Sequence, residues 1–200
     1  MNNFYEENYQ HYFNSTVDLD PSVFLEPFIR LLKPQETILD IGCGSGRDLR
    51  WFARMGFQPT GFEQSPSLAR LAREHANCPV IEGDFHSYNF SQLQFSALAF
   101  VGSLVHLPKE DVPAILQSTC QALAPNGVIL ITMKEGKGTS SVADGRIFTL
   151  WLREEIEKIF AENNFRILDF SRQISKLRPE DMWLGYVLKL NNQKLKQREN

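Results

Sequence analysis

The chain has 200 residues, of which 42% are hydrophobic and 22% charged, and its net charge is −3. This length and composition are typical of one globular domain and exclude a disordered or fibrous chain, so we expect residues 1–200 to form a single domain. A chain this close to neutral lacks the basic surface that binds nucleic acid or acidic lipid, and we expect neither partner.

The first 20 residues form an aromatic-rich leader that has two interpretations. One is an amphipathic helix that caps the core and the other is a lid whose rings face a bound ligand, and the two are compatible. Acids stand where a secretory signal would carry positive charge, which favours a cytoplasmic location. Three cysteines without a C-x-x-C spacing agree with a reducing compartment and predict neither a disulfide framework nor a metal site. The aromatic residues of the leader are Phe4, Tyr5, Tyr9, Tyr12 and Phe13.

Strand-like and helical patterns alternate along the rest of the chain. Such alternation is typical of βαβ units around a parallel sheet. The predicted strands lie at 37–41, 58–63, 79–82, 96–102, 127–133, 165–170 and 183–190. The predicted helices lie at 22–32, 47–55, 66–75, 109–122 and 150–162. The turn residues Pro125-Asn126-Gly127 are expected to separate a helix from the strand that follows it.

The most informative segment runs from Thr37 to Asp48 and reads T-I-L-D-I-G-C-G-S-G-R-D. An apolar strand that ends in an acid leads here into Gly42, Gly44 and Gly46. Glycines at this point let the backbone turn tightly and approach a nucleotide-like ligand before a helix begins. The dinucleotide fingerprint G-x-G-x-x-G fails because Arg47 stands where the third glycine should be, which disfavours NAD and FAD.

The pattern D-x-G-x-G-x-G resembles the first motif of the class I S-adenosylmethionine (SAM) dependent methyltransferases. The resemblance continues at Glu63, about 20 residues past the glycines, and at Gly83-Asp84-Phe85. It implies that Glu63 binds the ribose of SAM, that Gln64 and Asp84 lie at the adenine, and that Phe85 packs on the adenine ring. The other cofactor-binding residues that it implies are Asp40, Gly42, Cys43, Gly44, Gly46, Val101 and, from the leader, Tyr12.

The same resemblance implies the fold and the place of the chemistry. We expect a Rossmann-like, doubly wound α/β fold with seven strands, mostly parallel with the last antiparallel, and helices on both faces. With that strand order the loops after Ile41 and Val101 flank one crevice. The second loop carries His106, the expected catalytic residue, because an imidazole can take a proton from a hydroxyl or ammonium acceptor. One alternative is that His106 is a structural residue. The other is that the reaction needs no general base, because holding the acceptor close to the methyl group is enough.

The segment between Met133 and Leu150 is rich in glycine and serine, which predicts a mobile excursion near the same crevice. Lys134 and Arg146 are expected substrate contacts, and the Arg146 guanidinium suits a carboxylate or phosphate. A solvated charged loop is the alternative. Trp183 is a further expected substrate contact, or else a core residue.

The leading hypothesis is therefore a SAM-dependent methyltransferase that acts on a small molecule. The alternatives are a SAM-binding protein without catalysis and a methyltransferase acting on protein or nucleic acid. Against nucleobase amino methylation, the fourth strand ends F-V-G-S and not in an N/D-P-P-Y/F box. Residues 95–97 read Phe-Ser-Ala where many relatives have Phe-Asp, which weakens the match slightly. Residues 191–200 are expected to be a flexible tail, and nothing in the sequence indicates the acceptor or the oligomeric state.

Overall fold

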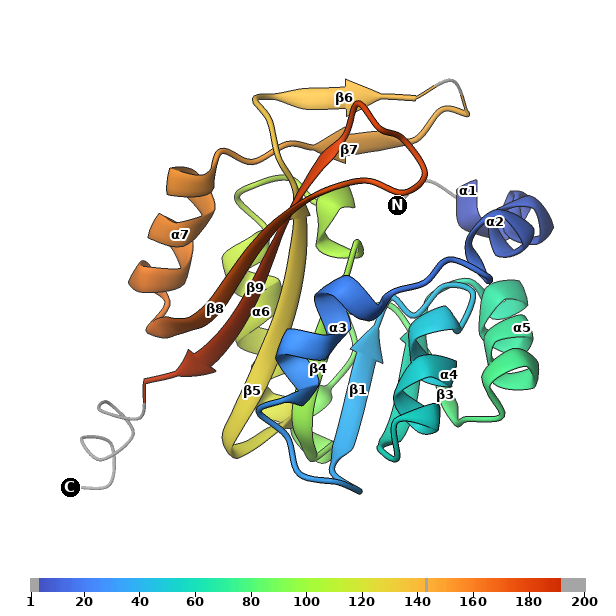
Figure 1. Ribbon diagram of the computed structural model, residues 1–200, viewed down its shortest axis with the longest axis horizontal. Helices are drawn as coiled ribbons and strands as arrows, with labels where there is room; N and C mark the ends of the chain where they lie inside the picture. The colour runs from blue at the N-terminus through green and yellow to red at the C-terminus, as the bar shows by residue number, and fades with distance from the viewer. Residues whose placement is uncertain (1–3, 143, 192–200) are drawn as a thin grey trace.

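The computed structural model describes residues 4–142 and 144–191 as a sheet with helices on both faces (Figure 1). The central sheet has seven strands in the order β3-β2-β1-β4-β5-β9-β8. The last strand, β9, pairs antiparallel with β5 and β8, and the other neighbours pair parallel. The predicted doubly wound α/β fold is thus confirmed. The strand bounds are β1 Thr37–Ile41, β2 Gln58–Glu63, β3 Val80–Glu82, β4 Phe95–Val101, β5 Leu123–Lys134, β8 Phe165–Ile174 and β9 Met182–Leu190.

Successive residues of β1 point into two different apolar clusters, one on each face of the sheet. Ile38 packs in the cluster that holds Leu25 and Phe52, from the helices α3 and α4. Leu39 packs in the cluster that holds Leu116 of α6 and Phe160 of α7. Burial on both faces explains why β1 is a continuous apolar run. The helix bounds are α3 Ser22–Ile29, α4 Arg47–Arg54, α5 Pro66–Ala76, α6 Val112–Thr119 and α7 Arg153–Glu162.

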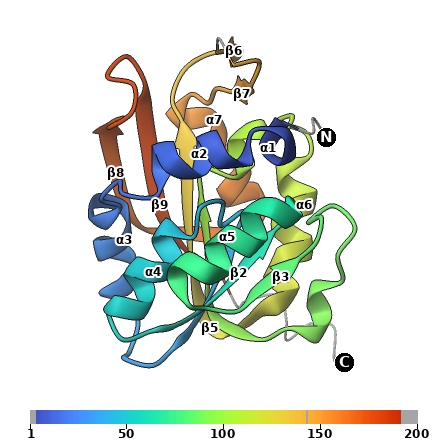
Figure 2. The ribbon, with the colours of Figure 1, turned by 90° about the vertical axis from the view of Figure 1, so that its right-hand side faces the viewer.

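The leader forms two short helices, α1 Phe4–Glu7 and α2 Tyr9–Thr16. Figure 2 shows them lying across the top of the sheet, where the parallel strands end, below a small hairpin. None of the helices within residues 4–142 and 144–191 combines the length and apolar character needed to cross a membrane.

Two details of the predicted elements are wrong. The segment after β5 is not an irregular excursion, because it contains the hairpin β6 Thr139–Ser141 and β7 Ile147–Thr149. Its turn is closed by a hydrogen bond from the Val142 amide to the Arg146 carbonyl and by Gly145 at φ 88°. Further back, β5 already begins at Leu123, so Pro125-Asn126-Gly127 lies within a strand, opposite the register shift between Phe95 and Ala97. Nearly all of the predicted tail, residues 192–200, lies outside the described residues.

Candidate active site

A cavity of about 870 Å³, called here the main cavity, opens beyond the carboxyl ends of β1, β2 and β4. These ends meet where the strand order reverses between β1 and β4, the position at which open α/β sheets bind ligands. Residues that the sequence analysis assigned to the cofactor and residues that it assigned to the acceptor line this same cavity. The site residues named there that line it are Gly42, Gly44, Glu63, Gln64, Phe85, Val101, Tyr12, His106 and Arg146.

The three glycines of the turn after β1 have different roles. A Cβ atom on Gly44 would lie 3.0 Å from the Tyr12 ring, and one on Gly42 would lie 2.5 Å from Cβ of Ser103. Both glycines line the main cavity, and the lack of a side chain lets Tyr12 and Ser103 pack close to the turn at its floor. A Cβ on Gly46 would instead meet the backbone of Ala72 at 2.8 Å. Gly46 thus lets α4 pack closely on α5, and its expected contact with a cofactor stays a prediction.

Asp40 and Cys43 lie beneath the cavity and do not line it. The Cys43 sulfur faces Gly61 of β2, where an added Cβ would come within 2.7 Å of it. Only the backbone of Cys43 could therefore contact a ligand. Asp40 is 1% exposed, and its Oδ2 atom lacks a hydrogen-bond partner among the described residues. Burial, and then the neighbouring Asp48 carboxylate, raise the pKa of Asp40 well above its ordinary value.

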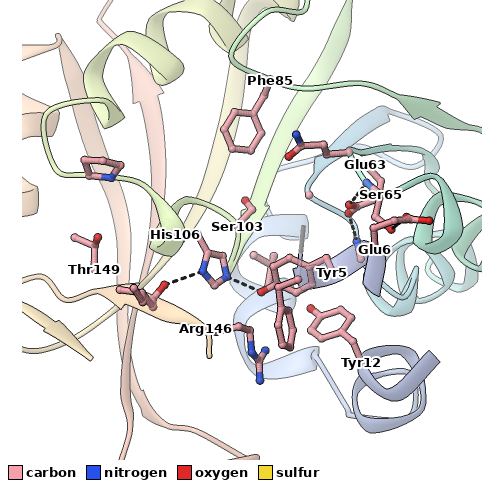
Figure 3. A pocket seen from close by; sticks show the side chains of 18 of the residues that line it. Tyr5, Glu6, Tyr12, Glu63, Ser65, Phe85, Ser103, His106, Arg146 and Thr149 are labelled. Carbon is pink, nitrogen blue, oxygen red and sulfur yellow. Dashed lines mark hydrogen bonds between the residues drawn. The ribbon is translucent and has the colours of Figure 1, made fainter. Parts of the chain in front are cut away.

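Glu63 is held at the end of β2 by two backbone hydrogen bonds. Its Oε2 atom accepts from the Gly44 amide and its Oε1 atom from the Ser65 amide, each at 2.9 Å. Burial raises the pKa of Glu63, and the two amides act in the opposite direction. A carboxylate has about four acceptor sites, so the side chain can still accept from two vicinal hydroxyls. It points into the cavity from the side opposite His106 (Figure 3).

The adenine-site residues predicted after β2 and β3 are only partly at the cavity. Gln64 and Phe85 line it, whereas Asp84 does not. The Asp84 carboxylate instead accepts from the Gln64 amide at 3.2 Å and from the backbone amide of His86 at 2.9 Å. In this structure Asp84 therefore positions Gln64 and the loop after β3.

His106 lies in a 3-10 turn after β4, with both ring nitrogens hydrogen-bonded. Nδ1 lies 3.1 Å from the carbonyl oxygen of Ile147, and Nε2 lies 2.6 Å from the hydroxyl of Tyr5 (Figure 3). A carbonyl can only accept, so Nδ1 carries the proton and Nε2 accepts from Tyr5. Burial, and then the Arg146 charge, lower the pKa of His106 to about 4, partly offset by the Ile147 hydrogen bond. The ring is neutral at pH 7.

The leader is tied to this site by contacts that the sequence did not reveal. Glu6 accepts hydrogen bonds from the hydroxyls of Ser65 and Ser67, both at 2.6 Å, and from the Ser67 amide at 3.1 Å. These bonds place the Glu6 carboxylate at the N-terminus of α5, where negative charge is stabilised. Tyr5 and Tyr12 both line the cavity, and their rings meet edge to face with centroids 5.0 Å apart. The resemblance implied a site role for Tyr12, but it is Tyr5 that makes the direct contact with His106.

The three predicted substrate contacts line a second, smaller space of about 190 Å³, called here the side cavity. It adjoins the main cavity at a shared wall that includes Tyr5, His106 and Arg146. Lys134 is not in a solvated loop, because it ends β5, is 2% exposed and pairs with Asp181 at 2.6 Å. Trp183 packs against Gly102, where an added Cβ would lie 3.3 Å from its ring.

Comparison with known proteins agrees with this geometry. Residues 38–127 match a family model described as a methyltransferase domain. Over that range, a little under half of the chain, the protein is similar to a methyltransferase domain, in agreement with the motifs that resemble the class I SAM-dependent methyltransferases. The match ends before the side cavity's walls at Lys134, Arg146 and Trp183. The family assignment therefore rests on the half of the chain that builds the cofactor end of the main cavity.

Relatives of this methyltransferase include two ubiquinone biosynthesis O-methyltransferases. The one from Xanthomonas campestris is 28% identical over 109 residues, covering 52% of this chain and 45% of the relative. The mitochondrial one from Schizosaccharomyces pombe is 29% identical over 184 residues, covering 87% of this chain and 64% of the relative. The chain thus spans about half the length of the Xanthomonas relative.

Among solved structures, a Burkholderia thailandensis 1,6-didemethyltoxoflavin-N1-methyltransferase is similar with a TM-score of 0.71 and 18% identity. The similarity covers 94% of this chain and 88% of that one, which was crystallised with 1,6-didemethyltoxoflavin and S-adenosylhomocysteine (SAH). At this identity the comparison establishes the shared fold.

The cofactor of this family is SAM, and the residues of the main cavity fit it. Gly44 lines the cavity without a side chain, so its backbone is open to a bound ligand next to the Tyr12 ring. Glu63 offers acceptors for a ribose, and Gln64 and Phe85 offer polar and apolar contacts for an adenine.

Proposed function

We propose that the protein transfers a methyl group from SAM to a small-molecule acceptor. The observation that carries this proposal is the main cavity, which joins Gly44 and Glu63 at one end to His106 at the other. A lid of leader helices covers it, so the site suits an acceptor that can be enclosed rather than a polymer. When bound, SAM would supply an electrophilic methyl group on a sulfonium.

The chain's own residues hold and enclose the reactants. Glu63 accepts hydrogen bonds from a ribose, and Gln64 and Phe85 contact an adenine. Tyr5 and Tyr12 exclude water, and the face of either ring favours a neighbouring cation. Enclosure and orientation lower the entropic part of the barrier, which is much of what an in-line displacement requires.

His106 would receive the acceptor's proton at Nε2. With a pKa of about 4 the imidazole is a weak base, but it is neutral and able to accept throughout the physiological range. An attacked oxygen or nitrogen becomes far more acidic once it carries the methyl group, so a weak base suffices when the proton moves late. In this structure the Tyr5 hydroxyl donates to Nε2 of His106, the position that the acceptor's own O–H or N–H group would take. Tyr5 must therefore move away from His106 before the acceptor binds.

The proposal places the protein in a reducing compartment such as the cytoplasm. Support comes from the thiols of Cys43, Cys78 and Cys120, all of them free. Two of these thiols are buried.

Calorimetry with SAM, SAH and NAD tests the cofactor. We expect the first two to bind, and tight binding of NAD without SAM would overturn the assignment. Incubation with methyl-labelled SAM and a metabolite extract, followed by mass analysis, tests the acceptor. Labelling of protein or RNA alone would show that the acceptor is a polymer, and binding of SAM without any turnover would leave a SAM-binding protein.

A further inference from the structure

The side cavity carries an unbalanced positive charge at one place in its wall. Five of its lining side chains are cationic: Arg47, Lys134, Arg146, Lys176 and Arg178. Three of them each have an acid of their own at hydrogen-bonding distance. These pairs are Arg47 with Asp48 at 2.7 Å, Lys134 with Asp181 at 2.6 Å and Lys176 with Asp20 at 3.0 Å.

Arg146 and Arg178 share a single carboxylate. Asp144 Oδ2 lies 2.6 Å from Nη2 of Arg146 but 3.8 Å from Nη2 of Arg178, and the second distance is too long for a hydrogen bond. Within the part of the chain that the structure describes, one positive charge is therefore left without an acid of its own, and the two guanidinium groups share it. The other titratable groups in the shared wall do not balance it, because His106 is neutral at pH 7 and burial raises the pKa of the Tyr5 and Tyr12 hydroxyls above its ordinary value.

Aromatic side chains form a large part of the remaining wall of the side cavity, beside aliphatic ones such as Val23 and Ile174. Tyr5, Tyr12, Phe24, Phe148 and Trp183 all line it. A volume of about 190 Å³ is smaller than pockets for drug-sized ligands, so the occupant is small. Planar rings pack well against such walls, and forked guanidinium groups bind carboxylates with two parallel hydrogen bonds.

We propose that Arg146 and Arg178 bind the carboxylate of the methyl acceptor, and that this acceptor is a small aromatic carboxylic acid. This inference rests on the proposed function and adds the chemical class of the substrate. Asp144 stands where the acceptor's carboxylate binds, and the acceptor competes with it for the two guanidinium groups. The acid enters through the side cavity and presents its nucleophilic atom at the shared wall, beside His106.

Asp144 allows a test in which binding improves. Asp144→Asn removes the competing charge but keeps the Oδ1 atom that accepts from the Arg146 amide at 3.1 Å, so the hairpin turn is retained. Benzoate serves as the probe, titrated by calorimetry into protein saturated with SAH. We expect Asp144→Asn to bind benzoate about fivefold or more tightly than the wild type, and Arg178→Gln about tenfold or more weakly. If Asp144 merely held Arg146 in place, Asp144→Asn would weaken benzoate binding, and the proposal would be wrong.

A control variant and two further ligands distinguish this proposal from a general charge effect, a non-aromatic acid and a phosphate ligand. Arg172→Gln removes an arginine that pairs with Glu135 and does not line the side cavity, so benzoate binding should be unchanged. Cyclohexanecarboxylate should bind more weakly than benzoate, and equal binding would overturn the aromatic part of the proposal. Phenyl phosphate that binds much more tightly than benzoate would assign the site to a phosphate.

SAH provides the remaining distinction. Normal SAH binding without benzoate binding overturns the carboxylate site and leaves the proposed function standing. Loss of SAH binding in Arg178→Gln would assign the pair to the cofactor instead. A wild-type protein that binds no SAH contradicts the proposed function itself.

Discussion

The hydroxyl of Tyr5 donates a hydrogen bond to Nε2 of His106 at 2.6 Å, between residues 101 positions apart in the chain. The other ring nitrogen, Nδ1, is 3.1 Å from the Ile147 carbonyl, which fixes the tautomer. The leader helix α1 and the β6–β7 hairpin are thereby joined through one imidazole. The nitrogen that would accept a substrate proton is covered by the lid when no substrate is present.

The acid limit of activity should reflect the lowered pKa of His106. Because burial lowers that pKa from 6.5 to about 4, the ring should stay in its accepting form well below pH 6.5. We expect kcat/KM not to decrease near pH 6.5 through protonation of His106. His106→Asn should lower kcat about a hundredfold or more and leave SAH affinity nearly unchanged. Activity that survives the substitution within a fewfold would show that positioning alone carries the rate.

The same residue predicts how stability depends on pH. Below pH 6.5 the unfolded chain binds a proton at His106, whereas the folded protein does so only near pH 4. The free energy of unfolding therefore decreases as the pH falls from 6.5 to 4, by at most about 3 kcal/mol from this residue. Urea unfolding at pH 7 and pH 4.5 should show wild type losing more stability on acidification than His106→Gln. Parallel losses in the two proteins would contradict the assignment.

A side chain at Gly44 should remove cofactor binding. Gly44 has φ 52°, and a Cβ there would lie 3.0 Å from the Tyr12 ring, in the floor of the main cavity. Gly44→Val should abolish SAH binding at a cost of about 1–2 kcal/mol in stability from the backbone strain. Gly56→Val is the matched control, since Gly56 has φ 87° and nothing within 4 Å of an added Cβ. Calorimetry should find normal SAH binding in the control, and normal binding in both variants would mean that the glycine turn holds no ligand.

Removing the charge of Glu63 should weaken cofactor binding without unfolding the protein. Hydrogen bonds to a charged acceptor contribute about 1.5–3 kcal/mol, so Glu63→Gln should raise the Kd for SAH roughly tenfold or more. Glu82, the register partner of Glu63 on β3, is an exposed acid paired with Arg73 at 3.1 Å. Glu82→Gln is therefore the control, and SAH titrations should leave it unchanged. An equal effect in both variants would point to general electrostatics and not to a ribose contact.

The sequence predicted the sheet well because its signals are local. The apolar run that ends at Ile41 and the glycines after it determine both the strand and the turn. The hairpin was missed because its strands are three residues each and are stabilised by pairing with one another, which no periodicity reveals. The separate role of Gly46 could not be predicted either, because it depends on Ala72 of another helix.

Pairs distant in the chain account for what was missed in the site. Glu6 reads as an ordinary surface acid, yet it caps α5 through Ser65 and Ser67. Lys134 follows an apolar run and stands two residues before Gly136, which predicted a loop. Its burial depends on Asp181, from the turn before β9. Asp144, close to Arg146 in sequence, also approaches Arg178, and only the fold brings that second arginine near.

On the proposal that the leader acts as a lid, removing residues 1–13 should lower turnover far more than stability. None of the described residues 4–16 belongs to the three apolar core clusters, and the aromatic side chains of the leader are only half-buried. It is held instead by polar contacts, those of Glu6 with α5 and that of Tyr5 with His106. The Arg146 guanidinium also lies 5.2 Å from the Phe4 ring centroid, which links the leader to the hairpin.

Segments that are held by a few polar contacts open at low free-energy cost, as acceptor entry requires. Hydrogen exchange at the Ser67 amide, which donates to Glu6, should slow when SAH and acceptor bind and should be fast in the truncated protein. Full kcat after truncation, or complete protection of that amide in the free protein, would show that the leader is fixed scaffold.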